Sequence, residues 1–272
     1  MNKIIHVYAI GDLHGDHRAV RNFYQRHMQL HRDINNGIDN VLICLGDFGG
    51  NFFFNHRDIE FKKKLGTYNL TYFVIRGNYE ERPSLCAAKD ENAWTQEVYF
   101  GNRVWVEKAF PYIKYAMDYP ALYEINGYKT LVIPGAYSVD KYMRLANDWP
   151  WFAHEQLSQE EMNSGIELLD HINWNVDIVL SHTCPICYEP TDLFLSFVDQ
   201  SMEEKDMERY LSQIEYQLDY SVHLWGHYHQ YREYPREIGV PCSKNPRQLM
   251  LFNDYVVELQ DVMTNKNLVN RL

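Results

Sequence analysis

The sequence has no hydrophobic run long enough to cross a bilayer, and it does not begin with a basic segment followed by an apolar one. We therefore expect a cytoplasmic protein without a membrane partner. Basic residues are also scarce, since 26 lysines and arginines stand against 37 acidic residues and leave a formal net charge of −11. Proteins that grip long nucleic acids through phosphates usually have basic surfaces, so extended nucleic-acid binding is not expected.

Paired cysteines are missing as well. The five cysteines are an odd number and lie far apart in the chain, which argues against a disulfide framework. They are Cys44, Cys86, Cys184, Cys187 and Cys242. Cys184 and Cys187 form a lone Cys-x-x-Cys, whereas a structural zinc site would need a second pair. We interpret these two residues as reduced thiols in a loop.

Short apolar segments alternate with helical patterns in the first third of the chain. Residues 4–10, 41–45 and 70–75 are rich in β-branched residues and typical of buried strands. Residues 16–33 and 57–65 carry the apolar spacing of helices. Strands separated by helices predict right-handed β-α-β units and a largely parallel sheet.

The rest of the chain continues this alternation, apart from one stretch. Residues 122–125 and 129–133 flank Asn126-Gly127, the strongest short signal for a β-hairpin. Further strands are predicted at 176–180, at 222–225 and within 249–259, and helices at 158–172 and 203–218. Residues 84–119 are aromatic and charged without a clear period. We predict a single domain over residues 1–272, with 84–119 as a variable insert of irregular structure.

Polar side chains follow five of the predicted strands, at the point where each strand ends. In parallel sheets, functional sites gather beyond the carboxyl ends of the strands, so these side chains should lie together. They are Asp12, His14, Asp47, Asn78, His182, His227 and His229. A lone histidine at such a place is usually structural, but seven nitrogen and oxygen donors at five strand ends predict a metal site. None is a thiolate, which favours Mn, Fe or Zn over soft metals.

The order of these motifs is Asp-x-His, Gly-Asp, Gly-Asn-x-Glu, Ser-His and Gly-His-x-His, between Asp12 and His229. It resembles the calcineurin-like metallophosphoesterase superfamily. Residues 76–80 resemble the serine/threonine phosphatase branch, and residues 135–144 and 149–151 resemble bacterial or phage-type members. The resemblance implies an α/β fold, a four-layer α/β/β/α sandwich of two mixed sheets flanked by helices.

The resemblance also implies a binuclear centre of two divalent metal ions, with Mn²⁺ as the first expectation and Fe, Zn or Ni as alternatives. The first ion would be held by Asp12, His14 and His229. The second ion would be held by Asn78, His182 and His227. Asp47 would bridge both ions, because a carboxylate has two oxygens.

The implied activity is hydrolysis of phosphomonoesters by attack of a metal-bridging hydroxide, as in protein phosphatases. The substrate would be a phosphorylated small molecule or a phosphoprotein. The residues expected to take part in catalysis are Asp47, Asn78, Tyr79 and Glu80, with Glu80 as an orienting residue. Tyr79 stands where the family has a histidine, and with a pKa near 10 a tyrosine is the poorer acid.

The sequence departs from the phosphatase branch a second time, because no arginine closely follows Asp47. Tyr137, Lys141 and Arg144 follow a strand in the part of the chain that should border the site. We consider them as substrate-binding residues, since a cation there could bind a phosphate oxygen, and a solvated loop is the alternative. Two alternatives stay open. One is a phosphodiesterase that acts on a nucleotide or short nucleic acid, and the other is a non-catalytic scaffold that binds metal.

Overall fold

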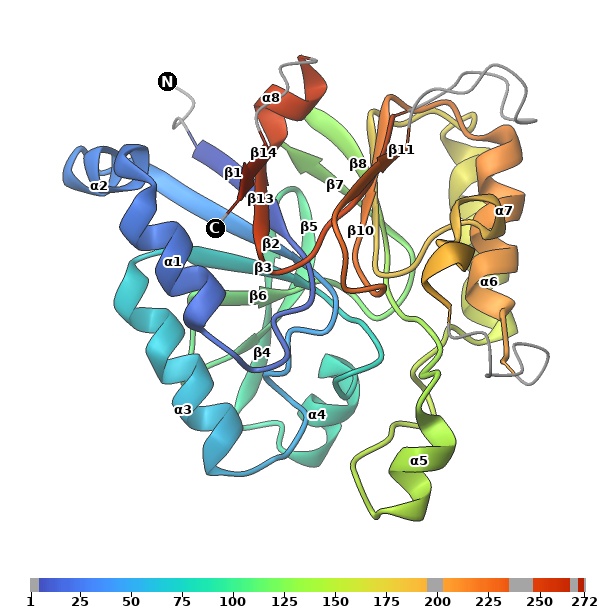
Figure 1. Ribbon diagram of the computed structural model, residues 1–272, viewed down its shortest axis with the longest axis horizontal. Coiled ribbons are helices and arrows are strands. Elements are labelled where there is room, and N and C mark those ends of the chain that lie inside the picture. The colour runs from blue at the N-terminus through green and yellow to red at the C-terminus, as the bar shows by residue number, and fades with distance from the viewer. Residues whose placement is uncertain (1–4, 195–202, 235–246, 265–268, 272) are drawn as a thin grey trace.

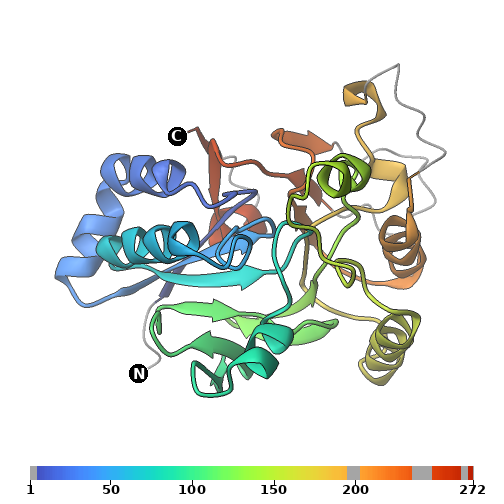
Figure 2. The same cartoon turned by 90° about the horizontal axis from the view of Figure 1, so that it is seen from below.

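The computed structural model describes residues 5–194, 203–234, 247–264 and 269–271 of the 272-residue chain. Two β-sheets pack face to face, and helices cover the outer face of each sheet (Figure 1). The same four layers are visible when the molecule is turned by 90° (Figure 2). The predicted α/β/β/α sandwich of two mixed sheets is therefore confirmed.

The first sheet has eight strands in the order β14-β13-β1-β2-β3-β6-β5-β4. Its four central strands are parallel: β1 (Ile5–Ile10), β2 (Asp39–Leu45), β3 (Thr71–Ile75) and β6 (Ile113–Tyr115). Antiparallel strands complete both edges: β4 (Trp94–Tyr99), β5 (Asn102–Glu107), β13 (Tyr255–Glu258) and β14 (Val269–Arg271). The loops that follow β1, β2 and β3 therefore leave the sheet at the same end.

The second sheet has six strands in the order β11-β12-β10-β9-β8-β7. Four are parallel: β8 (Tyr128–Ile133), β9 (Ile178–Ser181), β10 (Val222–Trp225) and β12 (Arg247–Met250). At the two edges, β7 (Ala121–Ile125) pairs antiparallel with β8, and β11 (Arg232–Tyr234) pairs antiparallel with β12. The carboxyl ends of β9 and β10 therefore also lie side by side.

Helices flank both sheets. On the first sheet lie α1 (Arg18–Arg26), α2 (Met28–Asn35) and α3 (His56–Leu65), and on the second lie α6 (Gln159–His171) and α7 (Asp206–Gln217). Three shorter helices are α4 (Pro83–Lys89), α5 (Lys141–Ala146) and α8 (Leu259–Met263), and single 3₁₀ turns cover Gly66–Tyr68, Ile186–Tyr188 and Thr191–Leu193.

Side chains that alternate along the central strands contribute to two parts of the core, one between the two sheets and one between the first sheet and its helices. In β1, Val7 and Ala9 face the second sheet, while Tyr8 and Ile10 face the helices. This follows from the two-residue period of a strand, and burial on both faces explains why the segment is almost uniformly apolar. Rigid strands covered on both sides hold the loops at their carboxyl ends in place.

Most of the predicted elements are confirmed to within a few residues, and two segments differ. The predicted helix 16–33 is two helices, because the backbone of His27 leaves the helical region at φ −91° and ψ 89°. Residues 84–119 are not irregular, since they form most of α4 and strands β4 to β6 at one edge of the first sheet. Their status as a variable insert stays a prediction.

The turn between β4 and β5 explains why that hairpin is hard to recognise. Phe100 and Gly101 have φ of 51° and 77°, close to the 53° and 80° of Asn126 and Gly127 in the predicted hairpin. Asparagine tolerates this left-handed conformation, whereas a large aromatic residue rarely adopts it. The hairpin thus has the expected geometry with an unusual residue at its first turn position.

Two absences predicted from the sequence concern membrane spans and disulfides. Among the described residues, no helix is both long and apolar enough to cross a membrane. The cysteines at positions 44, 86, 184 and 187 are all free thiols. Cys242 lies outside the described residues.

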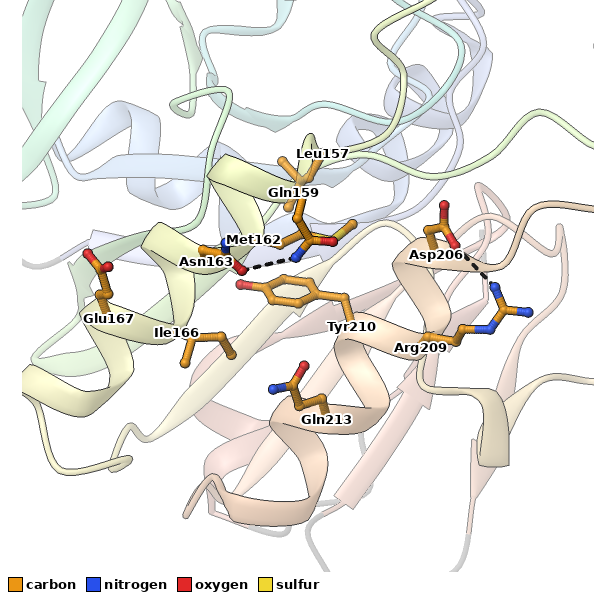
Figure 3. Close-up of a pocket in the computed structure, with 10 residues that line it drawn as sticks. All are labelled: Leu157, Gln159, Met162, Asn163, Ile166, Glu167, Asp206, Arg209, Tyr210 and Gln213. Carbon is orange, nitrogen blue, oxygen red and sulfur yellow. Dashed lines mark hydrogen bonds and ion pairs between the residues drawn. The ribbon is translucent and has the colours of Figure 1, made fainter.

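Helices α6 and α7 flank a groove of about 670 Å³ into which Tyr210 projects from α7 (Figure 3). A Cβ atom added to Gly165 in α6 would lie 2.1 Å from the Tyr210 hydroxyl and 2.9 Å from a ring carbon of Pro120. The two helices can approach this closely only because position 165 has no side chain.

We therefore expect Gly165→Ala to lower the free energy of unfolding by about 1–3 kcal/mol through overpacking. Helix propensity alone predicts the opposite sign, since alanine is better than glycine by about 1 kcal/mol in a helix interior. Urea unfolding measures the change, and Ser164→Ala, at the exposed neighbouring position, is the matched control. Equal stabilisation by both substitutions would contradict the packing argument.

Candidate metal centre

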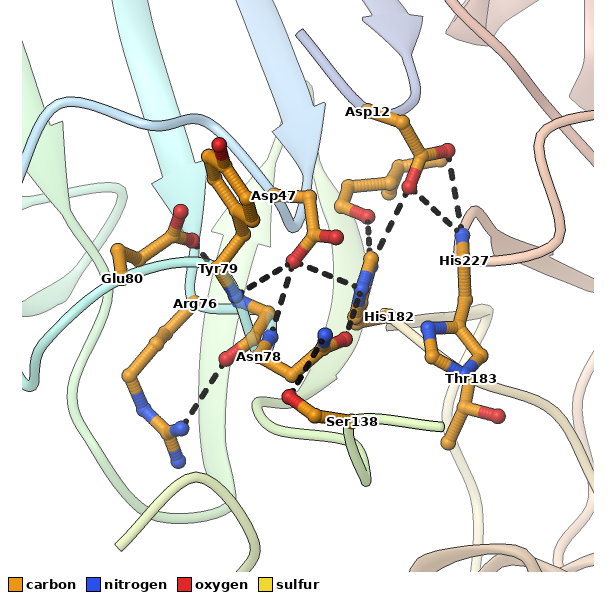
Figure 4. Close-up of polar contacts among 12 residues, drawn as sticks. Asp12, Asp47, Arg76, Asn78, Tyr79, Glu80, Ser138, His182, Thr183 and His227 are labelled. Carbon is orange, nitrogen blue, oxygen red and sulfur yellow. Dashed lines mark hydrogen bonds and ion pairs between the residues drawn. The ribbon is translucent and has the colours of Figure 1, made fainter. Parts of the chain in front are cut away.

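Loops from both sheets meet at the carboxyl ends of the parallel strands, and they carry all seven predicted donors. Figure 4 shows five of them, Asp12, Asp47, Asn78, His182 and His227, converging on one region. The loops after β1, β2 and β3 supply the first four donors along the chain, and those after β9 and β10 supply the last three. The site therefore lies across the junction of the two sheets.

One group of donors consists of Asp12, His14, Asp47 and His229, whose ligand atoms all lie within 4.8 Å of one another. The Nε2 atoms of His14 and His229 are 2.9 Å apart. Nε2 of His14 lies 3.7 Å from Oδ2 of Asp47. Two imidazoles and two carboxylates at these separations could hold one divalent ion.

A second group lies on the other side of Asp47. Nε2 of His182 is 3.1 Å from Oδ1 of Asp47 and 3.1 Å from Oδ1 of Asn78. The ring centroid of His227 lies 4.9 Å from that of His182. Asp47 thus points one oxygen toward each group, which is the arrangement that a bridging carboxylate requires.

Five of the seven donors have a backbone conformation that side chains rarely adopt. These donors have φ between 45° and 74°, and they are Asp12, His14, Asp47, His227 and His229. Each such residue costs about 1–2 kcal/mol, so the conformation persists only where the surrounding structure enforces it. Strain concentrated at converging donors fits a binding site better than a purely structural cluster.

Glycines beside the donors make the close approach possible. A Cβ atom at Gly46 would lie 2.0 Å from Nδ1 of His182, and one at Gly77 would lie 2.2 Å from Oδ1 of Asp47. These two glycines are therefore needed for space, which is a second signal of the site in the sequence.

Hydrogen bonds orient the second group. Nδ1 of His182 donates to the Leu45 carbonyl over 2.7 Å, so Nε2 faces the other donors. Burial would lower the pKa of His182, but the adjacent Asp47 outweighs this and raises it to about 9. Burial likewise opposes ionisation of Asp47, yet His182 holds the pKa of the carboxyl well below its usual range. The two groups form an ion pair that a metal could replace.

Two of the other donor histidines, His14 and His227, are in the neutral form that binds metal. Partial burial lowers the pKa of His14, and it lowers that of His227 to about 3. Both imidazoles are therefore predominantly neutral near pH 7, with a lone pair available on the ring.

The amide of Asn78 has its orientation set by two residues that the sequence did not suggest. Oγ of Ser138 donates to the Glu155 carboxylate over 2.5 Å and accepts from the Asn78 side-chain nitrogen over 3.2 Å. Because a carboxylate only accepts, the Ser138 hydroxyl proton points toward Glu155, and the Asn78 nitrogen must face Ser138. Oδ1 of Asn78 is thereby left to face His182. No local motif links positions 78, 138 and 155.

Two further predicted residues flank the donors. The Tyr79 ring stacks on Phe52 at 3.6 Å between centroids and meets the edge of His14 at 4.7 Å. Burial raises the pKa of its hydroxyl. Glu80 points away from the donors, since its carboxylate accepts the backbone N–H groups of Gly49 and Gly77. Glu80 therefore acts on the loops rather than on a reacting group.

The three predicted substrate-binding residues lie in different surroundings. The guanidinium carbon of Arg144 sits 5.2 Å from the ring centroid of Tyr79, and Nη1 lies 3.4 Å from the Asn78 carbonyl. Lys141 instead forms an ion pair with Glu204 at 3.3 Å and lies over the ring of Tyr137. Of the three, Arg144 is the one in contact with the strand-end motifs.

Glu80 offers a direct test of how the loops are held. Glutamine can accept only one of the two N–H groups, so Glu80→Gln should lower the free energy of unfolding by about 1–3 kcal/mol. Because burial raises the pKa of Glu80 to about 7, the measurement is made near pH 8, where the carboxylate is charged.

Glu81→Gln is the matched control, because Glu81 pairs with the exposed Lys89 and such pairs are worth up to about 1 kcal/mol. Thermal or urea unfolding of both variants gives the comparison. A loss for Glu80→Gln no larger than that of the control would show that the carboxylate does not hold the two loops.

Comparison with known proteins identifies the family. Residues 5–231 match the model of the calcineurin-like phosphoesterase family, a span that includes all seven donors. No curated protein sequence matches the chain.

Among solved structures, the hypothetical protein PH1004 from Pyrococcus horikoshii OT3 is 10% identical, with 99% of this chain and 87% of that chain covered and a TM-score of 0.38. A novel archaeal phosphodiesterase is 10% identical, with 98% of both chains covered and a TM-score of 0.36. By its match over most of its length, this chain belongs to the calcineurin-like phosphoesterase family.

Proposed function

We propose that the protein hydrolyses phosphomonoesters with the help of two divalent ions, in the first place Mn²⁺. The observation that carries this proposal is the position of Asp47, whose two oxygens face separate groups of donors. The family implies hydrolysis of phosphoesters, and preference for monoesters is our inference.

The donor set fits this pair of ions. We assign Asp12, His14 and His229 to the first ion, and Asn78, His182 and His227 to the second, with Asp47 shared. All are nitrogen or oxygen donors, as ions of this hardness prefer. Bound ions of this kind would activate water as the nucleophile and offset the negative charge of the phosphate.

Arg144 supports a substrate with a terminal phosphate. Its guanidinium lies beside Asn78 and Tyr79, and its Nε pairs with Asp140 at 2.8 Å, which fixes the side chain. A guanidinium donates several parallel hydrogen bonds and suits the free oxygens of a monoester. Arg144 would thus take the place of the arginine that is missing after Asp47.

The first experiment is the metal content of the purified protein, together with hydrolysis of p-nitrophenyl phosphate and bis-p-nitrophenyl phosphate, with and without added Mn²⁺. We expect two metals per chain and faster, metal-dependent turnover of the monoester. Preference for the bis-ester would favour a phosphodiesterase, and absence of bound metal would favour a scaffold.

Asp47→Asn tests the shared ligand. Substitution of a residue that only hydrogen-bonds a metal ligand typically lowers activity by roughly 10–100-fold. Because Asp47 would bind both ions directly, we expect turnover of the variant to fall by more than this. Bound metal should fall as well, as elemental analysis would show. The matched control is Asp16→Asn, since the Asp16 carboxylate bonds to Arg18 at the start of α1 and is not one of the predicted donors. Normal turnover by Asp47→Asn would exclude the proposed centre.

Tyr79→His tests proton donation to the leaving group. A general acid typically contributes about 100-fold or more when the leaving group is poor, so the gain should appear with alkyl phosphates and be small with p-nitrophenyl phosphate. The nearby Arg144 would lower the imidazole pKa, so the gain should be largest at acidic pH. Tyr79→Phe is the control. Identical rates of the unchanged protein and both variants on an alkyl phosphate would show that the side chain at position 79 takes no part in the reaction.

A further inference from the structure

A pocket of about 540 Å³ adjoins the candidate metal centre, and His227 and His229 form part of its wall. Tyr137 and Val139 line it from the segment before α5, and Tyr228 separates the two histidines along the chain. A phosphate bound by the proposed metal ligands would therefore direct its organic group into this pocket. The inference below rests on the proposed function for that placement.

The wall of this pocket is strongly acidic. Among the described residues, it includes five carboxylates and one lysine: Asp140, Glu189, Glu203, Glu204, Glu208 and Lys205. Three ion pairs connect these carboxylates with basic residues, Arg144 to Asp140, Lys141 to Glu204 and Lys205 to Glu189. Glu208 takes part in none of these three pairs, so its charge adds to the wall and disfavours an anionic organic group.

Glu208 adds a second and independent observation. Its side chain is only 4% exposed, and Oε1 accepts a hydrogen bond from Thr183 over 2.7 Å. Oε2 is buried and has no hydrogen-bond partner. A buried carboxylate oxygen without a donor is costly, so a ligand that brings a donor or a positive charge would be stabilised there.

Aromatic rings supply the rest of the wall. Phe194 and Tyr228 stack at 6.2 Å between centroids. The ammonium of Lys205 lies 5.2 Å from the centroid of Phe194, and that of Lys141 lies 5.5 Å from the centroid of Tyr137. The faces of these rings thus already accommodate positive charge, which ring quadrupoles attract.

We infer that the organic group of the natural substrate carries an ammonium, primary or quaternary, on a short and partly apolar body. The phosphate would lie at the metal centre, the ammonium near Glu208 and the apolar part against Phe194 and Tyr228. Burial raises the pKa of Glu208 to about 7, and a bound cation would favour its charged form.

Phosphocholine and 3-phosphoglycerate are suitable probes, because both are small phosphomonoesters and their organic groups carry opposite charges. With Mn²⁺ present, release of inorganic phosphate should show a kcat/KM at least about tenfold higher for phosphocholine, equivalent to about 1.4 kcal/mol. Equal values, or preference for 3-phosphoglycerate, would overturn the inference.

Glu208→Gln keeps an acceptor for Thr183 and removes the charge. The ratio of the two kcat/KM values should fall several-fold in this variant, whereas Glu91→Gln, an exposed position outside the pocket, should leave it unchanged. A ratio that Glu208→Gln does not alter would contradict the role given to Glu208, provided that thermal unfolding shows the variant folded.

Binding of the free organic groups separates this inference from the proposed function. Calorimetry should detect choline and not glycerate, and Glu208→Gln should weaken choline binding. Metal-dependent turnover of p-nitrophenyl phosphate without selectivity for phosphocholine would overturn only the inference. Failure to hydrolyse any ester would overturn the proposed function, and choline binding alone would then decide whether the pocket accepts a cation.

Discussion

The carboxylate of Asp47 joins the two sheets at the point where all the functional loops meet. Oδ1 accepts the backbone N–H groups of Asn78 and Tyr79, from the loop after β3, and lies 3.1 Å from His182, from the loop after β9. A buried carboxylate must be paired and hydrogen-bonded, so these loops have to take their places together when the sheets pack. The charge of His182 offsets that of Asp47 at the centre of this arrangement.

This arrangement is strained, and the strain has a local cause. Five of the predicted donors, including Asp12 and His229, have left-handed backbone, a conformation that persists only where the surrounding structure enforces it. The apolar core between the sheets, with residues such as Phe73 and Leu224 fully buried, supplies the rigidity that maintains these conformations. The buried strands thus supply the rigidity, and the strained left-handed residues lie in the loops at their carboxyl ends.

The parts of the molecule that the sequence predicts are those with local signals. The apolar strand 5–10 and the glycine-flanked donors at 12 and 47 can be recognised from neighbouring residues alone. The link from Asn78 through Ser138 to Glu155 joins residues up to 77 positions apart, so no local pattern reveals it. The β4–β5 hairpin was missed for a different reason, since Phe100 occupies a turn position where asparagine or glycine is expected.

The two departures from the phosphatase pattern become related once the structure is known. Tyr79 stands where the family has a histidine, and under the proposed function Arg144 in α5 would supply the guanidinium that is absent after Asp47. Arg144 lies over the face of the Tyr79 ring and near Phe52, at 5.2 Å and 5.8 Å from their centroids. An aromatic face attracts this cation, whereas a protonated imidazole at the same place would repel it. The position of Arg144 therefore favours a neutral aromatic residue at position 79.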